Sequence, residues 1–178
     1  MKKVLILSGS PRRNGNSDTL CDRFALGATE AGHTVEKIFL KDKKIGYCTG
    51  CGYCFNAHKC SQKDDMTEII EKMLEADVLV FATPVYFYSM DAQMKTLIDR
   101  TTPRYTDMSN KECYFILTAA DTEKANLERT METFRGFTED CLEDARECGV
   151  IYGTSAWNIG DVQNTPAYNE AYEMGKQV

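Results

Sequence analysis

Short apolar runs alternate with longer amphipathic segments along most of the chain. The apolar runs are rich in β-branched and aromatic residues, so we predict strands over residues 2–7, 33–40, 77–82, 111–119 and 150–157. Apolar residues recur at helical spacing in the intervening segments, which predicts helices over about residues 17–31, 66–74, 91–101, 122–148 and 166–177. This alternation predicts an α/β fold in which helices cover both faces of a five-stranded parallel sheet. Residues 1–178 form one domain in this interpretation, with a cysteine-rich loop insertion at about residues 41–64.

Small and polar residues follow the first predicted strand, directly before a helix. Backbone N–H groups and the helix dipole make such a helix N-terminus an anion site, for which phosphate is a natural ligand. The glycine spacing fits neither the dinucleotide fingerprint nor the P-loop. A polar turn with a serine helix cap is the alternative interpretation. The candidate phosphate-binding residues are Ser10, Arg12, Asn14, Asn16 and Ser17.

A proline and three aromatic residues follow the third predicted strand. In parallel α/β sheets, ligands bind beyond the carboxyl ends of the strands. Aromatic faces and backbone amides suit a flat ring with a polar edge, such as the isoalloxazine ring of a flavin. The alternative is an aromatic cluster that covers the core or contacts another subunit. The candidate ring-binding residues are Thr83, Pro84, Val85, Tyr86 and Phe87.

Four of the eight cysteines lie in one loop with the spacing C-x-x-C-x-x-C-x5-C, at Cys48, Cys51, Cys54 and Cys60. Thiolates at this density suit a [4Fe–4S] cluster, and the glycines among them let the backbone curl tightly. Three alternatives remain. The loop holds no cluster and is redox-active or merely packed, it binds zinc through four cysteines or through three and His58, or Cys51 and Cys54 form a reversible thiol–disulfide couple.

Three further expectations concern side chains outside these motifs. Asp65 and Glu68 form a predicted capping box at the start of a helix. Arg100 is expected to make a structural salt bridge. The remaining cysteines fall on predicted apolar faces and are expected to pack as small hydrophobic groups: Cys21, Cys113, Cys141 and Cys148.

Composition narrows the class of protein. Apolar residues make up 43% and charged residues 27% of the chain, which is typical of a globular protein. The net charge of −6 argues against nucleic acid or an anionic membrane as a partner. No apolar run approaches the roughly 20 residues of a membrane span, and the first run is too short for a signal peptide. We therefore expect a cytoplasmic protein whose clustered cysteines serve metal or redox chemistry rather than disulfides.

The motifs together resemble the flavodoxin-like NAD(P)H-dependent FMN reductase superfamily, and within it the iron–sulfur flavoprotein branch. The resemblance covers roughly residues 1–120 and rests on Gly9-Ser10-Pro11-Arg12 with Gly15-Asn16-Ser17, on the cysteine loop running into Asp64-Asp65-Met66, and on Thr83-Pro84-Val85-Tyr86-Phe87. It implies a flavodoxin-like three-layer sandwich with strand order 2-1-3-4-5. It also implies non-covalently bound FMN, a [4Fe–4S] cluster on the cysteine loop, and a homodimer or homotetramer. The loop that ends at Asp121 is expected to close the other side of the ring.

The resulting functional hypothesis is an FMN-dependent oxidoreductase. NAD(P)H or a ferredoxin would supply electrons and a quinone would accept them, and no side chain need act as a catalyst because the flavin performs the chemistry. Two alternatives remain: a non-enzymatic iron–sulfur flavoprotein that carries electrons between redox proteins, and a phosphate-binding module with a structural zinc loop.

Overall fold

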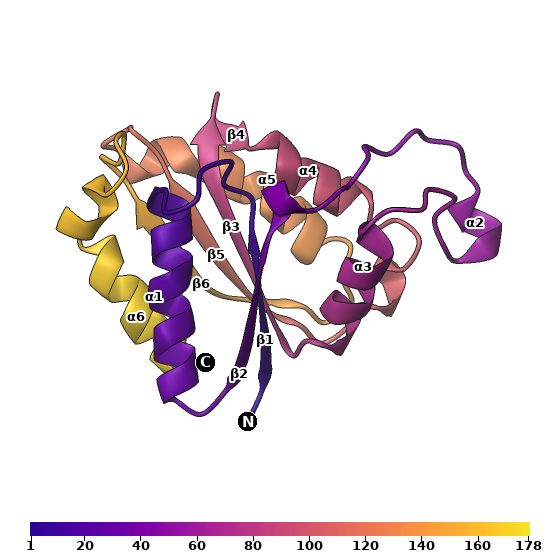
Figure 1. The fold of residues 1–178 in the computed structure, drawn as a ribbon, viewed down its shortest axis with the longest axis horizontal. Helices are drawn as coiled ribbons and strands as arrows, with labels where there is room; N and C mark the ends of the chain where they lie inside the picture. Colours follow the sequence, from indigo (N-terminus) through magenta and orange to yellow (C-terminus); the bar gives the residue numbers. More distant parts are fainter.

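The computed structural model describes all residues, 1–178, and has a parallel sheet at its centre (Figure 1). The five long strands lie in the order β2-β1-β3-β5-β6, and every neighbouring pair is parallel. Their bounds are β1 Lys3–Ser8, β2 Thr34–Phe39, β3 Val78–Tyr86, β5 Glu112–Thr118 and β6 Arg146–Gly153. This arrangement confirms the predicted sheet and its flavodoxin-like strand order.

Helices cover both faces of the sheet (Figure 1). One face carries α1 (Asn16–Glu30) and α6 (Ala167–Lys176), and the other carries α3 (Met66–Glu75), α4 (Ala92–Asp99) and α5 (Glu128–Thr138). None of the helices combines the length and apolar character that a membrane span requires. The short elements are α2 (Cys54–Ala57) and the 3₁₀ helices η1 (Leu40–Asp42), η2 (Tyr105–Asp107), η3 (Lys124–Leu127) and η4 (Asp161–Asn164).

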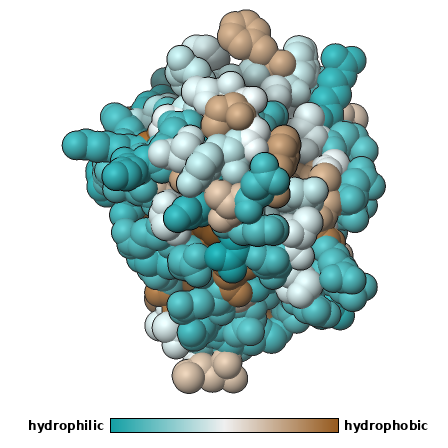
Figure 2. All heavy atoms as spheres, turned by 90° about the vertical axis from the view of Figure 1, so that its right-hand side faces the viewer, coloured by the Kyte–Doolittle hydropathy of each residue, from teal (hydrophilic) through white to brown (hydrophobic).

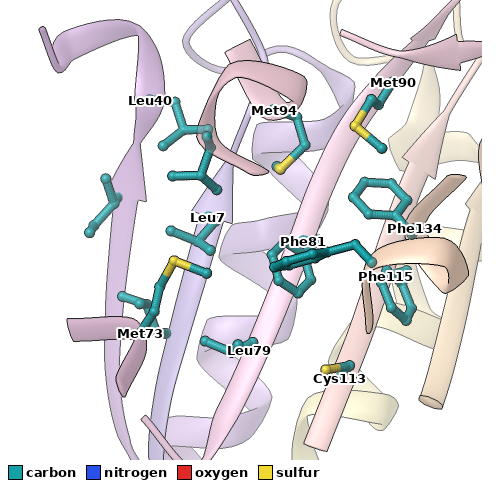
Figure 3. Close-up of a cluster of buried hydrophobic side chains, with 14 of the residues drawn as sticks. Leu7, Leu40, Met73, Leu79, Phe81, Met90, Met94, Cys113, Phe115 and Phe134 are labelled. Atoms are coloured by element: carbon teal, nitrogen blue, oxygen red, sulfur yellow. The ribbon is translucent and has the colours of Figure 1, made fainter. Parts of the chain in front are cut away.

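Two apolar layers hold the helices to the sheet. The larger layer lies under α3, α4 and α5 and contains Leu7, Leu79, Phe81, Phe115 and Phe134 (Figure 3). The smaller layer lies under α1 and α6. β1 and β3 contribute residues to both layers, because successive side chains of a strand point to opposite faces. Their nearly continuous apolar sequence follows from this burial on both sides.

The end of β3 differs from the predicted loop. Residues 83–86 continue the strand, and Tyr86 then enters a two-residue hairpin with β4 (Ser89–Met90). Phe87 and Tyr88 at the hairpin tip have φ values of 50° and 61°. Two left-handed residues are what a type I′ turn requires, although glycine and asparagine usually supply them. The sequence prediction missed the hairpin because aromatic residues occupy this strained turn.

The predicted helix over residues 122–148 is wrong in its second half. α5 ends at Thr138, and β6 begins at Arg146, four residues before the predicted strand. The Arg146 N–H group bonds the Lys111 carbonyl, so sheet pairing with β5 outweighs the helical spacing there. As a result Cys141 and Cys148 are exposed rather than buried, whereas Cys21 and Cys113 are buried as expected.

The predicted capping box at α3 is also wrong. The Asp65 side chain does not cap the helix; it accepts from the Lys44 N–H group. Asp64 accepts from the Met66 N–H group instead, at 3.2 Å. The acidic pair therefore joins the start of α3 to the cysteine loop, which leaves the compact body and carries α2 at its far end (Figure 1).

Candidate functional site

A cleft of about 680 Å³ lies at the carboxyl ends of β1, β3 and β5. This is the edge of the sheet where the strand order reverses between β1 and β3, the usual ligand position in such folds. Three walls form the cleft. The lining residues are Ser10, Arg12, Asn16 and Ser17 on the first wall, Pro84, Val85 and Tyr86 on the second, and Thr118, Ala119, Ala120, Ala156, Trp157, Asn158 and Ile159 on the third.

The first wall is a tight loop that leaves backbone donors free. Ser10 Oγ accepts from the Arg12 N–H group at 3.2 Å and donates to the Arg12 carbonyl at 3.0 Å, which closes the turn. α1 begins after Gly15 without a side-chain cap. The N–H groups of Asn16, Ser17 and Asp18 therefore have no acceptor within the chain. This end of the cleft has free donors and the positive end of the helix dipole.

Arg12 is the only charged residue that lines the cleft. It has no ion-pair partner in the structure. Its neighbour Arg13 pairs with Asp42 and lies over the Phe39 ring, with its guanidinium carbon 4.7 Å from the ring centroid. The two adjacent arginines thus differ sharply: only the guanidinium of Arg12 is available to an anion in the cleft.

Asn16 anchors the third wall through its side-chain amide. Its Nδ2 donates to the Asn158 carbonyl at 2.9 Å, and its Oδ1 accepts from the N–H groups of Gly160 and Val162. These bonds turn the amide toward the third wall, and they leave the backbone N–H group of Asn16 free. These bonds hold Trp157, 73% exposed, beside the cleft. Sequence analysis missed residues 156–159, because only this long-range bonding brings them to the site.

Four predicted ligand residues lie outside the cleft lining. Asn14 is exposed, and its N–H group bonds Asp18. Thr83 is buried against Asp91. The Phe87 ring is fully exposed at the hairpin tip. The Asp121 carboxylate accepts from the Glu123 N–H group and from Asn126, so it shapes the turn before η3.

The four loop cysteines line a second, small cavity of about 70 Å³. Gly50 and Gly52 between them have φ values of 65° and 72°, which favour glycine. Hydrogen bonds from the Tyr53 backbone and the Ser61 hydroxyl hold the pKa of the Cys51 thiol below its usual value. The side chains are not gathered as a ligand set: no group of three or more Cys, His, Asp or Glu is placed to hold a metal ion.

Arg100 joins the end of α4 to this loop. Its guanidinium donates to both carboxylate oxygens of Asp64, at 2.7 and 2.9 Å, and to the Gly46 carbonyl. The expected structural salt bridge is therefore present, with the arginine side chain only 1% exposed.

Comparison with known proteins identifies the family. The model of NADPH-dependent FMN reductases matches residues 2–135. The chain belongs to this FMN reductase family. A putative NAD(P)H-dependent FMN-containing oxidoreductase of Bacillus subtilis is 30% identical over 131 residues, which cover 68% of this chain and 69% of that protein.

Other relatives of this FMN reductase family member are named iron–sulfur flavoproteins. An iron–sulfur flavoprotein of Archaeoglobus fulgidus is 46% identical over 103 residues, 58% of this chain and 46% of that protein. One from Methanocaldococcus jannaschii is 47% identical over 102 residues, 57% of this chain and 52% of that protein. The chain therefore spans about half the length of these curated relatives.

Solved structures share the fold of this family member. An NAD(P)H:quinone oxidoreductase from Methanothermobacter marburgensis superposes with a TM-score of 0.76 at 20% identity, over 99% of this chain and 96% of that one. An azoreductase from Bacillus anthracis gives 0.76 at 18% identity over the full length of both chains. At this identity the likeness establishes the flavodoxin-like architecture alone.

A buried carboxyl lies directly behind the first wall of the cleft. Asp91 caps α4, where its Oδ1 accepts from the Met94 N–H group at 3.2 Å, while its Oδ2 has no partner. Burial raises the pKa of this carboxyl to about 7, and the bonds from Met94 and Thr83 oppose the rise only in part. A Cβ added at Gly9 would lie 2.5 Å from the same Oδ1, so the loop that faces the cleft rests on Asp91.

Proposed function

We propose that this chain binds FMN in the three-walled cleft and transfers electrons from NAD(P)H to an acceptor such as a quinone. The observation that carries the proposal is the polarity of the cleft. One end offers free backbone N–H groups and an unpaired arginine, and the other is lined by proline, valine, tyrosine and tryptophan. A mononucleotide flavin has the same polarity, with a phosphate at one end and a flat ring at the other.

The phosphate is assigned to the first wall. The N–H groups of Asn16, Ser17 and Asp18 would donate to its oxygens, and Arg12 would neutralise its charge. The Ser17 hydroxyl is 2.6 Å from the Thr118 hydroxyl, which fixes it beside the third wall. The close turn at Gly15, where a Cβ would lie 2.9 Å from the Arg12 carbonyl, lets the backbone approach the ligand.

The ring is assigned to the space between the second and third walls. Pro84, Val85 and Tyr86 would lie along one side, and Ala119 and Ala120 along the other. Bound FMN supplies hydride and electron transfer, chemistry that amino-acid side chains do not provide. The residues of the chain hold the ring, orient it and exclude water from its inner face.

The adjacent arginines test the phosphate assignment. Arg12→Ala removes a charge-assisted contact of about 1.5–3 kcal/mol and should weaken FMN affinity by at least tenfold. The affinity of the Arg12→Ala variant for riboflavin, which lacks the phosphate, should equal that of the wild-type protein. Arg13→Ala is the matched control, because Arg13 is paired with Asp42 outside the cleft. Fluorescence titration of the apoprotein measures all four affinities, and equal losses for FMN and riboflavin would contradict the assignment.

We further propose that Cys48, Cys51, Cys54 and Cys60 hold a [4Fe–4S] cluster that exchanges electrons with FMN. Their shared cavity and the two left-handed glycines support this, as do the names of the iron–sulfur flavoprotein relatives. The exposed loop would close around the metal, since its sulfurs are not gathered without it. Iron and sulfide analysis after anaerobic purification tests the cluster. Cys54→Ser should lower both contents and Cys141→Ser neither, whereas zinc in place of iron would favour the structural alternative.

Turnover separates an enzyme from an electron carrier. Steady NAD(P)H oxidation with a quinone under anaerobic conditions supports the reductase. Fast electron exchange with a ferredoxin, without NAD(P)H turnover, would support the carrier.

The predicted homodimer or homotetramer also stays a proposal. Tyr86, Phe87 and Tyr88 expose aromatic surface beside the cleft, and light scattering of the purified protein measures subunit number.

A further inference from the structure

Arg100 forms part of the wall of the cysteine cavity. The cavity is lined by the four loop cysteines and by residues at the end of α4, Arg100 among them. The segment that carries the cysteines protrudes on the right-hand side of Figure 1. The face of the molecule on that side is largely hydrophilic, and apolar and weakly polar residues gather in its upper half (Figure 2). Within this exposed setting the Arg100 side chain is the exception, because it is almost completely buried.

The bonds of Arg100 leave one of its three nitrogens without a partner. The two terminal nitrogens are occupied by Asp64, the Gly46 carbonyl and, at 3.2 Å, Gln62 Oε1. Nε is buried and has no acceptor in the chain. Buried polar atoms of native proteins are nearly always paired, and a free donor on a charged group is among the most costly to leave unpaired. This unpaired donor belongs to a residue that lines the cavity, so a group held in the cavity is the acceptor to look for.

The chemistry of the cavity indicates the acceptor. The groups that share the cavity with Arg100 include four sulfurs, and thiolate and sulfide accept hydrogen bonds. The ion pair with Asp64, at 2.7 Å, keeps the guanidinium charged beside these sulfurs.

We propose that Arg100 is a positioning residue for the cluster: its Nε donates to a sulfur of the bound cluster, and its charge raises the reduction potential of that cluster. The inference rests on the proposed cluster. Reduction adds negative charge to the cluster, so a fixed cation and a hydrogen bond to sulfur stabilise the reduced form more than the oxidised form. Asp64 moderates the effect, since its carboxylate compensates part of the arginine charge.

Two substitutions predict shifts of opposite sign. Arg100→Gln removes the charge and should lower the midpoint potential of the cluster. Asp64→Asn leaves Arg100 in place without its counter-charge and should raise it. Each should change the ratio of reduced to oxidised cluster at a fixed potential by about tenfold, which equals about 59 mV for a one-electron couple. A merely structural salt bridge predicts no such pair of opposite shifts, because each substitution would only loosen the same loop.

The experiment is a redox titration of anaerobically purified protein, followed by the absorption of the cluster and by the electron paramagnetic resonance of its reduced form. Arg104→Gln is the matched control: Arg104 also bonds carboxylates, Glu71 and Asp107, but does not line the cavity, so its variant should keep the wild-type potential. Arg100→Lys covers the case in which the glutamine variant retains no iron; it keeps the charge but loses the Nε donor, so its potential should lie below that of wild type.

The outcomes separate this inference from the proposals on which it rests. Opposite shifts in the Arg100 and Asp64 variants support it. Iron-loaded variants with unchanged potentials, or with shifts of the same sign, overturn the role of Arg100 and leave the cluster in place. Wild-type protein without iron overturns the cluster and this inference together, while FMN content, measured in the same samples, reports on the flavin site alone.

Discussion

The buried carboxyl of Asp91 allows a quantitative prediction for Asp91→Asn. The side chain is 1% exposed and caps α4 through Oδ1. Asparagine has the same shape and keeps an oxygen for the Met94 N–H group, so the cap survives. What the substitution removes is ionisation. No charged side chain contributes to the raised pKa of Asp91, which follows from burial and is only partly opposed by two hydrogen bonds.

The magnitude follows from proton linkage. The pKa of Asp91 is about 7 in the folded protein, against 3.8 for an unperturbed aspartate. Between these pH values the unfolded chain has lost the proton and the folded chain still holds it, so the free energy of unfolding falls as pH rises. One pKa unit corresponds to about 1.36 kcal/mol, so the full loss is about 4 kcal/mol. It is complete above pH 7 and absent below pH 4.

Urea unfolding of the wild-type protein and the Asp91→Asn variant from pH 4.5 to pH 8, at a fixed flavin concentration, measures this loss in the free energy of unfolding. The difference between variant and wild type isolates Asp91, because all other titrating groups are shared. We expect the difference to move in favour of the variant by about 3–4 kcal/mol between pH 4.5 and pH 8. Asp107→Asn, at an exposed carboxylate that pairs with Arg104, is the control. A difference for Asp91→Asn that does not change with pH would refute the reasoning.

Three further predictions concern packing and the cleft. Gly175→Ala places a Cβ 2.2 Å from the Phe24 carbonyl, between α6 and α1, and should destabilise the fold by about 1–3 kcal/mol; Gly136→Ala, with nothing within 4 Å, should stabilise it by up to about 1 kcal/mol, and thermal unfolding compares the two. Ser10→Asp places a carboxylate beside the FMN phosphate and should abolish flavin retention; unchanged flavin content after purification would contradict the phosphate placement. Trp157 is the only tryptophan, so FMN should quench the tryptophan fluorescence of the apoprotein; unaltered emission at saturating FMN would remove Trp157 from the site.

The first half of the site was predictable because its signals are local. An apolar strand, a loop of small polar residues and a helix start follow one another within residues 3–30, and strand order then places the loop at the switch point. The Pro84–Tyr86 wall was predictable for the same reason, because these residues directly follow the predicted strand over residues 77–82. The hairpin beyond it was not predictable, because it depends on Phe87 and Tyr88 accepting a left-handed backbone that their side chains disfavour.

The third wall depends on contacts that no short stretch of sequence records. Asn16 was expected among the phosphate-binding residues, and the structure adds that its side chain holds residues 158–162. The helix over residues 122–148 was overextended for a similar reason, since pairing of β6 with β5 decides where that segment becomes a strand.

The most direct measurement compares FMN and riboflavin binding to the unmodified apoprotein. The two ligands share a ring and differ in the phosphate, which the free N–H groups of Asn16, Ser17 and Asp18 and the Arg12 guanidinium are proposed to hold. The proposed site predicts that FMN binds at least tenfold more tightly than riboflavin. It also predicts that inorganic phosphate competes with FMN but not with riboflavin. Equal affinities for the two flavins, or no binding of either, would contradict it.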